Sequence, residues 1–174
     1  MLLTIESRAE ETALVRAAQS GDRAAFGALY SSYGRMVHGI LLAHVDYNDA
    51  EDLMQDVFLR AMEQVTGLRE ATAFGAWLGA IARRAAFDHH RRKRPMPMLI
   101  DRIPGGKRPD GEAFEVLEII QRLPESYREP LILRLVEGMT GPEIAARTGL
   151  TPDSVRVNLC RGMKLLRDQL ERRK

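Results

Sequence analysis

Residues 141–170 read GPEIAARTGLTPDSVRVNLCRGMKLLRDQL, and the fold of the C-terminal part of the chain follows from this stretch. The spacing of its apolar residues predicts a short helix over 142–148 and a long helix that begins at Pro152. Gly149 suits the left-handed residue that ends a helix, Thr151 suits an N-cap, and proline is favoured at the first helical position. The stretch therefore predicts two helices joined by a tight turn.

The residue types along these helices fit a helix-turn-helix. Such a motif needs a small residue where its helices cross, a turn glycine and an apolar residue that packs the second helix back; Ala145, Gly149 and Val155 fill these roles. The inward positions of the second helix are apolar, namely Val155, Leu159, Met163, Leu166 and Leu170. Its outward positions are mostly polar or basic, namely Asp153, Ser154, Val157, Cys160, Arg161 and Lys164, with Arg156 and Arg167 flanking them. A recognition helix offers its first residues to base edges and its cations to phosphates, so the pattern favours DNA binding over an αα-hairpin without function.

The rest of the chain also has helical spacing, and no segment shows the alternation expected of a strand. Residues 95–111 are rich in proline and glycine and lack any period, which is typical of a linker. The sequence therefore predicts an all-α protein with a helical domain over 8–94, a linker over 95–112 and a second helical domain over 113–172.

Composition excludes several classes of protein. The chain has 174 residues, 26 Lys and Arg against 24 Asp and Glu, a net charge of +2 and 45% hydrophobic residues, so it is neither a polycation nor a disordered acidic chain. Its one cysteine, Cys160, permits no internal disulfide and no cysteine-based zinc cluster. No apolar run is long enough for a membrane span or a signal peptide, so we expect no membrane insertion and a reducing, cytoplasmic location.

A helix predicted over 49–65, with Asn48 or Asp49 as its N-cap, has an apolar side and an acidic side. The apolar side carries Ala50, Leu53, Met54, Val57, Ala61 and Val65. The other side carries Asp52, Gln55, Asp56, Leu59 and Glu63. An apolar anchor inside an acidic rim suits a basic helical partner, although periodicity alone also allows a merely solvated face.

A second amphipathic helix, predicted over 74–92, has a basic side. Its core stripe is Phe74, Trp77, Leu78, Ile81, Ala82 and Ala85. The far side carries Ala80, Arg83, Arg84, Phe87, Arg91 and Arg94. Cations at a helix C-terminus match its dipole, but this explains the final run of bases and not Arg83, Arg84 and Phe87. Cations beside an aromatic ring favour nucleic acid, because phosphates need cations and unstacked bases need flat surfaces.

Taken in order, these segments resemble an extracytoplasmic-function (group 4) sigma factor of bacterial RNA polymerase. The resemblance covers about 14–170 and rests on LVRAAQSGDRAAFGALY (14–30), DAEDLMQDVFLRAM (49–62), FGAWLGAIARRAAFD (74–88), LPESYREPLILR (123–134) and the helix-turn-helix. It implies a helical bundle like sigma region 2, a linker, and a helix-turn-helix domain like sigma region 4.

The resemblance also implies site residues. It assigns binding of core RNA polymerase to Asp52, Gln55, Asp56 and Leu59. It assigns the −10 promoter element, including a pocket for a flipped base, to Gln64, Leu68, Ile81, Arg83, Arg84, Phe87 and Arg91. It assigns the −35 element to Ser154, Arg156, Val157, Asn158, Cys160, Arg161 and Lys164. Leu68, Arg84 and Asn158 depart from the residues common in the family, so the promoter sequence is not predicted.

The function implied is promoter recognition and −10 melting as a subunit of the polymerase, with promoter DNA, core polymerase and an anti-sigma factor as partners, no cofactor and no catalysis of its own. Two alternatives stay open. One is a helix-turn-helix regulator that acts without polymerase, which would not need the acidic side of helix 49–65. The other is a hydrolase that uses Asp88, His89 and Cys160. His89 and His90 are adjacent and diverge by about 100° on a helix, so we do not expect them to hold one metal ion.

Overall fold

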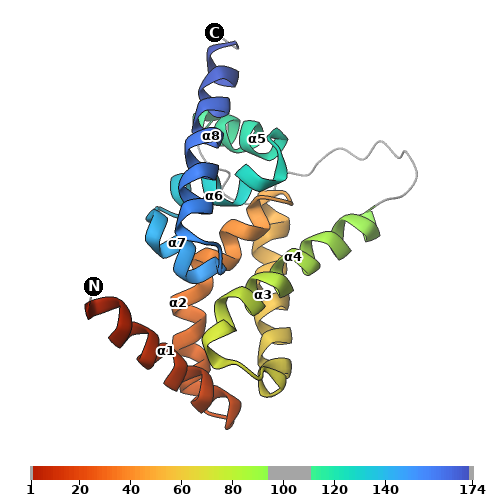
Figure 1. Cartoon of the computed structure of the whole chain (residues 1–174). Helices are drawn as coiled ribbons and strands as arrows, with labels where there is room; N and C mark the ends of the chain where they lie inside the picture. Colours follow the sequence, from red (N-terminus) through yellow and green to blue (C-terminus); the bar gives the residue numbers. More distant parts are fainter. Residues whose placement is uncertain (1, 94–110, 173–174) are drawn as a thin grey trace.

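The computed structural model describes residues 2–93 and 111–172, and these ranges contain helices and turns but no strand (Figure 1). The elements are α1 (Leu2–Gln19), α2 (Arg23–Leu42), α3 (Tyr47–Gln64), the 3-10 turns η1 (Val65–Gly67) and η2 (Ala71–Ala73), α4 (Phe74–Lys93), α5 (Gly111–Arg122), α6 (Glu125–Leu135), α7 (Gly141–Thr148) and α8 (Pro152–Glu171). The all-α prediction is confirmed. Of the predicted linker, 95–110 lies outside the described residues, and 111–112 belongs to α5.

Helices α1 to α4 form an N-terminal bundle around a continuous apolar core. Tyr33 of α2 packs edge-on against Phe74 of α4, with ring centroids 5.2 Å apart, and Leu29, Val37 and Leu78 are fully buried beside them. Asp22 caps α2 by accepting hydrogen bonds from two backbone N–H groups of its first turn. The core fixes which faces of α3 and α4 remain outside.

Helix α3 begins earlier than the sequence predicts. Its N-cap is Asp46 rather than Asn48 or Asp49, because Asp46 has the extended backbone of a cap and its carbonyl already accepts from Ala50 N–H at 2.9 Å. Three cap-forming residues lie within four positions, so composition alone does not select among them. The displacement leaves the helical faces unchanged.

The helix-turn-helix prediction is confirmed. Gly149 ends α7 in the left-handed conformation with φ 76°, and Thr151 caps α8 by accepting from Ser154 N–H. A capping box between Thr140 and Glu143 starts α7, and the paired hydrogen bonds hold the pKa of the Glu143 carboxyl below its ordinary value.

The prediction that Met163 of α8 faces inward is wrong. Met163 is 37% exposed, whereas its neighbour Gly162 is buried. A Cβ on Gly162 would lie 2.9 Å from Leu131 of α6, so α8 crosses α6 at this glycine and Met163 is turned to the edge of the contact. A glycine at a helix crossing carries no apolar signal, which is why the helical wheel missed it.

The C-terminal bundle of α5 to α8 packs on the N-terminal bundle. Helix α6 contacts α2, and α7 contacts both α2 and α4, so α7 lies between the rest of its own bundle and the lower half of the molecule in Figure 1. The proline- and glycine-rich composition of 95–111 gave no indication of this close packing. None of the described helices is both long and apolar enough to cross a membrane.

Candidate protein- and nucleic-acid-binding surfaces

The first surface is the outer side of α3. Asp52, Gln55 and Asp56 are exposed, and Leu59 is 55% exposed. The opposite side of α3 is anchored in the core through a buried stripe of Ala50, Leu53, Val57, Phe58 and Ala61. The predicted separation of an apolar side from an acidic side is therefore present, and Asp52, Gln55, Asp56 and Leu59 together are called the acidic face below. Such a face can receive a basic helix around a central apolar contact.

Tyr30 of α2 packs beside α3, and the sequence analysis missed this contact. Tyr30 is 41% exposed, and its ring lies 4.4 Å, centroid to centroid, from the ring of Phe58 in the buried stripe of α3. Met62, one turn beyond Phe58 on α3, is 45% exposed. No pattern within α3 points to Tyr30, because the contact depends on how α2 and α3 cross.

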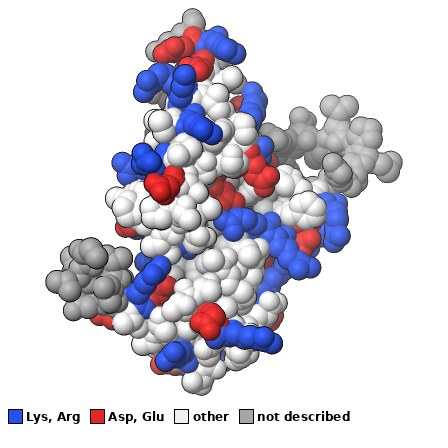
Figure 2. Space-filling view, viewed as in Figure 1, with Lys and Arg blue, Asp and Glu red and all other residues white. Residues whose placement is uncertain are grey.

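The second surface is the outer side of α4. Arg84 and Arg91 are exposed, and Phe87 is 68% exposed. These three residues with Arg83 are called the basic face below. Ile81, which the resemblance assigns to the flipped-base pocket, is half-buried and packs against the core. In the view of Figure 2, Lys and Arg side chains gather over the exposed side of α4 and along α8.

The loop between α3 and α4 is held by hydrogen bonds from α1, which the sequence analysis did not predict. Gln64 is exposed and Leu68 is half-buried. The side-chain amide of Gln19, at the end of α1, donates to the carbonyl oxygens of Val65 at 3.0 Å and of Leu68 at 2.6 Å. These bonds join residues more than forty positions apart in the chain, so no local sequence signal predicts them.

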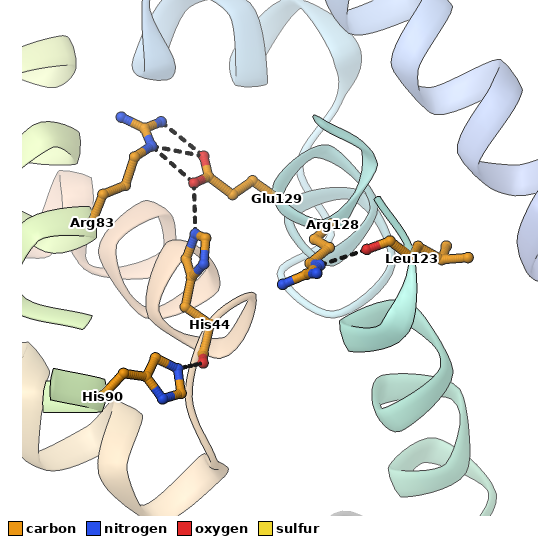
Figure 3. Close-up of polar contacts among 6 residues, drawn as sticks. All are labelled: His44, Arg83, His90, Leu123, Arg128 and Glu129. Atoms are coloured by element: carbon orange, nitrogen blue, oxygen red, sulfur yellow. Dashed lines mark hydrogen bonds and ion pairs between the residues drawn. The ribbon is translucent and has the colours of Figure 1, made fainter. Parts of the chain in front are cut away.

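Arg83 differs from the other members of the basic face because it is tied to Glu129 of α6 (Figure 3). Its Nε lies 2.8 Å from Oε1 and its Nη2 lies 2.8 Å from Oε2, which is a fork-to-fork pair, and His44 donates to Oε1 at 3.0 Å. Burial alone would raise the pKa of the Glu129 carboxyl, but the hydrogen bonds from His44 and Arg83 outweigh it and hold the pKa below its ordinary value. The carboxylate is therefore ionised and matched to its cation.

The third surface is the outer side of α8. The residues that the resemblance assigns to −35 DNA are all exposed except Asn158, namely Ser154, Arg156, Val157, Cys160, Arg161 and Lys164. Asn158 is half-buried because it lies only about 60° around the helix from the buried Val155. The exposed side thus offers small polar groups near its N-terminus and cations farther along, as major-groove binding requires.

The residues of the hydrolase hypothesis have structural partners. His89 lies 3.1 Å from Asp49 of α3, and Asp88 lies 3.7 Å from Arg91 on its own helix. His90 donates to the backbone oxygen of His44. Among the described residues, no cluster of three or more His, Cys, Asp or Glu side chains has the geometry to hold a metal ion.

Comparison with known proteins agrees with this geometry. The family described as Sigma-70 region 2 matches residues 29–95, and the family described as Sigma-70, region 4 matches residues 113–166. The RNA polymerase sigma factor CarQ of Myxococcus xanthus is 31% identical over 87% of this chain and 92% of its own length. The ECF RNA polymerase sigma-E factor of Haemophilus influenzae is 26% identical over 92% of this chain and 95% of its own.

Among solved structures, CnrH in complex with the cytosolic domain of CnrY has the same fold. The TM-score is 0.65, and the match covers 95% of this chain and 99% of that chain at 24% identity.

Proposed function

This chain belongs to the sigma-70 family as an extracytoplasmic-function sigma factor, and from that premise we propose that it binds core RNA polymerase, directs it to promoters and helps to melt the −10 region. The observation that carries the proposal is the exposed acidic face of α3, which a DNA-binding regulator working without polymerase would not need. The family resemblance implies that this face meets basic clamp helices of the polymerase large subunit, and an acidic rim around Leu59 would complement them.

The basic face of α4 and the loop after α3 are the proposed −10 surface. Arg84 and Arg91 supply cations for the phosphates, and the exposed ring of Phe87 supplies a stacking surface for an unpaired base. Gln64, Leu68, Ile81 and Arg84 are the proposed surroundings of a flipped base. Trapping such a base offsets an unpairing cost of a few kcal/mol, which is how binding alone can favour melted DNA.

The outer side of α8 is the proposed −35 surface. Val157 and Asn158 are proposed to reach base edges in the major groove, while Arg156, Arg161 and Lys164 contact phosphates on either side. Holding both promoter elements fixes the polymerase on the DNA in one direction. The proposal implies a cytoplasmic location, where polymerase and chromosome meet.

We also propose an anti-sigma factor as a partner. The family resemblance implies such a protein, and CnrH was solved together with another protein, the cytosolic domain of CnrY. A regulator of this kind would act by covering the acidic face, the DNA-binding surfaces or both.

Transcription with purified components tests the proposed function. Core polymerase plus this chain should produce transcripts from specific start sites on a genomic promoter library, and the chain should co-elute with core polymerase. The double reversal D52K with D56K should lower polymerase affinity about a hundredfold or more, because two attractive pairs become repulsive. Glu10→Lys, a charge reversal at an exposed position of α1, is the control.

A chain that drives no specific start and never co-elutes with core polymerase would contradict the proposal. If D52K with D56K abolished co-elution but promoter-specific regulation persisted, the polymerase-independent regulator would be the better account.

A further inference from the structure

One side of α1 carries two arginines and faces the loop that follows α3. At 100° per residue, four residues lie within about 80° of one another on this side, namely Arg8, Thr12, Arg16 and Gln19. Gln19 donates its side-chain amide to two backbone carbonyl oxygens of the loop. The same side of the helix therefore runs from the loop toward the N-terminal end of the chain.

A shallow groove lies between this side of α1 and the turn η2. Its volume is about 640 Å³, and it is lined by Arg8, Ala9, Thr12, Ala13, Arg16 and Thr72, which together are called the α1 groove below. The two alanines leave room beside the arginine side chains. Because α1 contacts both η1 and η2, the two walls of the groove belong to one packed unit.

The guanidinium groups of Arg8 and Arg16 are available to a ligand. Both residues are exposed, and neither forms an ion pair with a side chain in the part of the chain that the structure describes. Glu11, their acidic neighbour on α1, is already used, because it accepts a hydrogen bond from Tyr33 and lies 3.7 Å from Arg147. The groove therefore presents positive charge that its surroundings do not neutralise.

The α1 groove and the basic face extend in opposite directions from the loop. In Figure 1, α1 runs to one edge of the molecule and α4 to the other. Lys93 ends α4 and precedes the segment that connects to the −35 motif, so a strand bound near that end lies on the upstream side. A strand that follows α4 past Gln64 and Leu68 therefore reaches α1 with its downstream nucleotides.

We propose that the α1 groove binds the single-stranded DNA that leaves the −10 surface toward the start site, with Arg8 and Arg16 on its phosphates. This inference rests on the proposed function, which places the −10 strand on α4 and the loop. The two arginines are about 12 Å apart along the helix at 1.5 Å per residue, which spans about three nucleotides at 3.4 Å each. Thr72, exposed on the other wall, can donate its hydroxyl to a phosphate between them.

Binding in this groove is independent of base sequence. Cations and hydroxyls on phosphates carry no base information, and none of the lining residues has an aromatic ring on which a base could stack. The groove therefore holds the backbone of the melted strand and opposes its return to the duplex. It prolongs the melted state of a promoter without changing which promoter is chosen.

Strands of two lengths test the groove in the complex with core polymerase. Both are fluorescent single strands of a promoter that the transcription assay identifies, one ending at the flipped base and one extended by about six nucleotides downstream. The parent complex should bind the extended strand about tenfold more tightly at about 50 mM salt. Arg8→Gln with Arg16→Gln should lose most of this gain, and its unchanged affinity for the short strand would show that the variant is folded.

Salt dependence identifies phosphate contacts as the source of the gain. Each contact on a single strand contributes about 0.7 to the slope of log affinity against log salt, so two contribute about 1.4. An increase from about 50 to 200 mM salt should therefore reduce the gain of the parent about sevenfold and change that of the variant little. Arg122→Gln with Arg172→Gln is the matched control, because it changes the net charge equally at exposed positions of the C-terminal bundle.

Photo-crosslinking gives the position of the strand without removing a charge. Ala9→p-benzoylphenylalanine places the crosslinking group in the α1 groove and should attach to the extended strand but not to the short strand. The same amino acid in place of Glu10, which lies about 160° around α1 from Thr12, should attach to neither strand.

Two results would overturn the proposal while leaving the proposed function intact. One is an equal gain from the extension in the parent and in Arg8→Gln with Arg16→Gln. The other is a crosslink from position 9 to a polymerase subunit instead of DNA, because the groove would then be a protein contact. A parent chain that binds neither core polymerase nor the short strand would instead refute the proposed function, so the two failures are distinguishable.

Discussion

The acidic face of α3 and the basic face of α4 lie on adjacent helices of one bundle but differ in how they meet solvent. Every member of the acidic face is exposed. The basic face is divided, because Arg84, Phe87 and Arg91 are exposed while Arg83 is paired with Glu129 of the other bundle. The surface proposed for polymerase is ready in the free chain, whereas the surface proposed for DNA is partly occupied by the chain itself.

Removal of the Phe87 ring should cause the largest single-residue loss at the basic face. Base–aromatic stacking contributes about 1–3 kcal/mol, so Phe87→Ala should weaken binding of single-stranded −10 DNA to the holoenzyme about ten- to a hundredfold. Fluorescence anisotropy measures this. Polymerase affinity should not change, and Leu135→Ala, which removes another exposed apolar side chain, is the control. An equal loss of DNA affinity and of polymerase affinity would contradict the assignment of different partners to the basic face and the acidic face.

Truncation of Leu59 should have the converse effect. Leu59→Ala removes the apolar anchor of the acidic face and should lower affinity for core polymerase about tenfold, as expected for a contact near an interface centre. Binding of single-stranded DNA by the free chain should be unchanged. Titration of labelled polymerase with each variant measures the first effect, and an unaltered affinity would remove α3 from the proposed interface.

Gln19→Leu should show what the ordered conformation of the loop between α3 and α4 contributes, because it leaves the exposed side chains of both faces unchanged. Loss of the two hydrogen bonds to Val65 and Leu68 should lower the free energy of unfolding by about 1–2 kcal/mol, measured by urea denaturation. Because these bonds hold the loop proposed to surround the flipped base, promoter melting should fall several-fold while polymerase affinity is retained. Gln169→Leu on the exposed side of α8 should change neither quantity.

Acidification should weaken the contact between the two bundles, with a smaller effect than the substitutions. The pKa of Glu129 is depressed in the folded chain, so its stabilisation is fully present above its ordinary value of 4.5 and is lost as the pH falls through the lower pKa. Arg83 and His44 face the carboxylate, and the hydrogen bond to Glu129 raises the pKa of Arg83, so Arg83 stays charged throughout. The free energy of unfolding, measured by urea denaturation, should therefore fall at the acidic end, and the fall should be smaller in Glu129→Gln.

Features that depend on neighbouring residues could be predicted from the sequence, whereas contacts between distant residues could not. The turn at Gly149 and the cap at Thr151 depend on a few consecutive residues, and both were predicted correctly. The faces of α3 and α4 follow from helical period, and the burial of their described residues agrees with them, although Arg94 lies outside the described residues and Arg83 is held in a part-buried pair. A helical wheel assigns a side chain to a face of the helix but does not show which neighbouring helix that face meets. For this reason Met163 was predicted to face inward, although α8 crosses α6 at Gly162.

The features that sequence reasoning missed are pairings across long stretches of chain. Gln19 and Glu129 have no distinctive neighbours, and each acquires its role only when helices far apart in the sequence meet. Arg83 was identified as a candidate from its position on α4, but nothing in its surroundings in the sequence indicated that α6 would bind it. Contacts of this kind depend on how two bundles dock, which neither period nor capping encodes.

The most direct test of the account is run-off transcription with purified core polymerase on a genomic promoter library, in which the parent chain is compared with the double reversal D52K with D56K and with Glu10→Lys. The account predicts specific start sites with the parent and Glu10→Lys proteins, and loss of both these transcripts and polymerase binding with the double reversal. Specific transcripts of equal yield from the double reversal would contradict it.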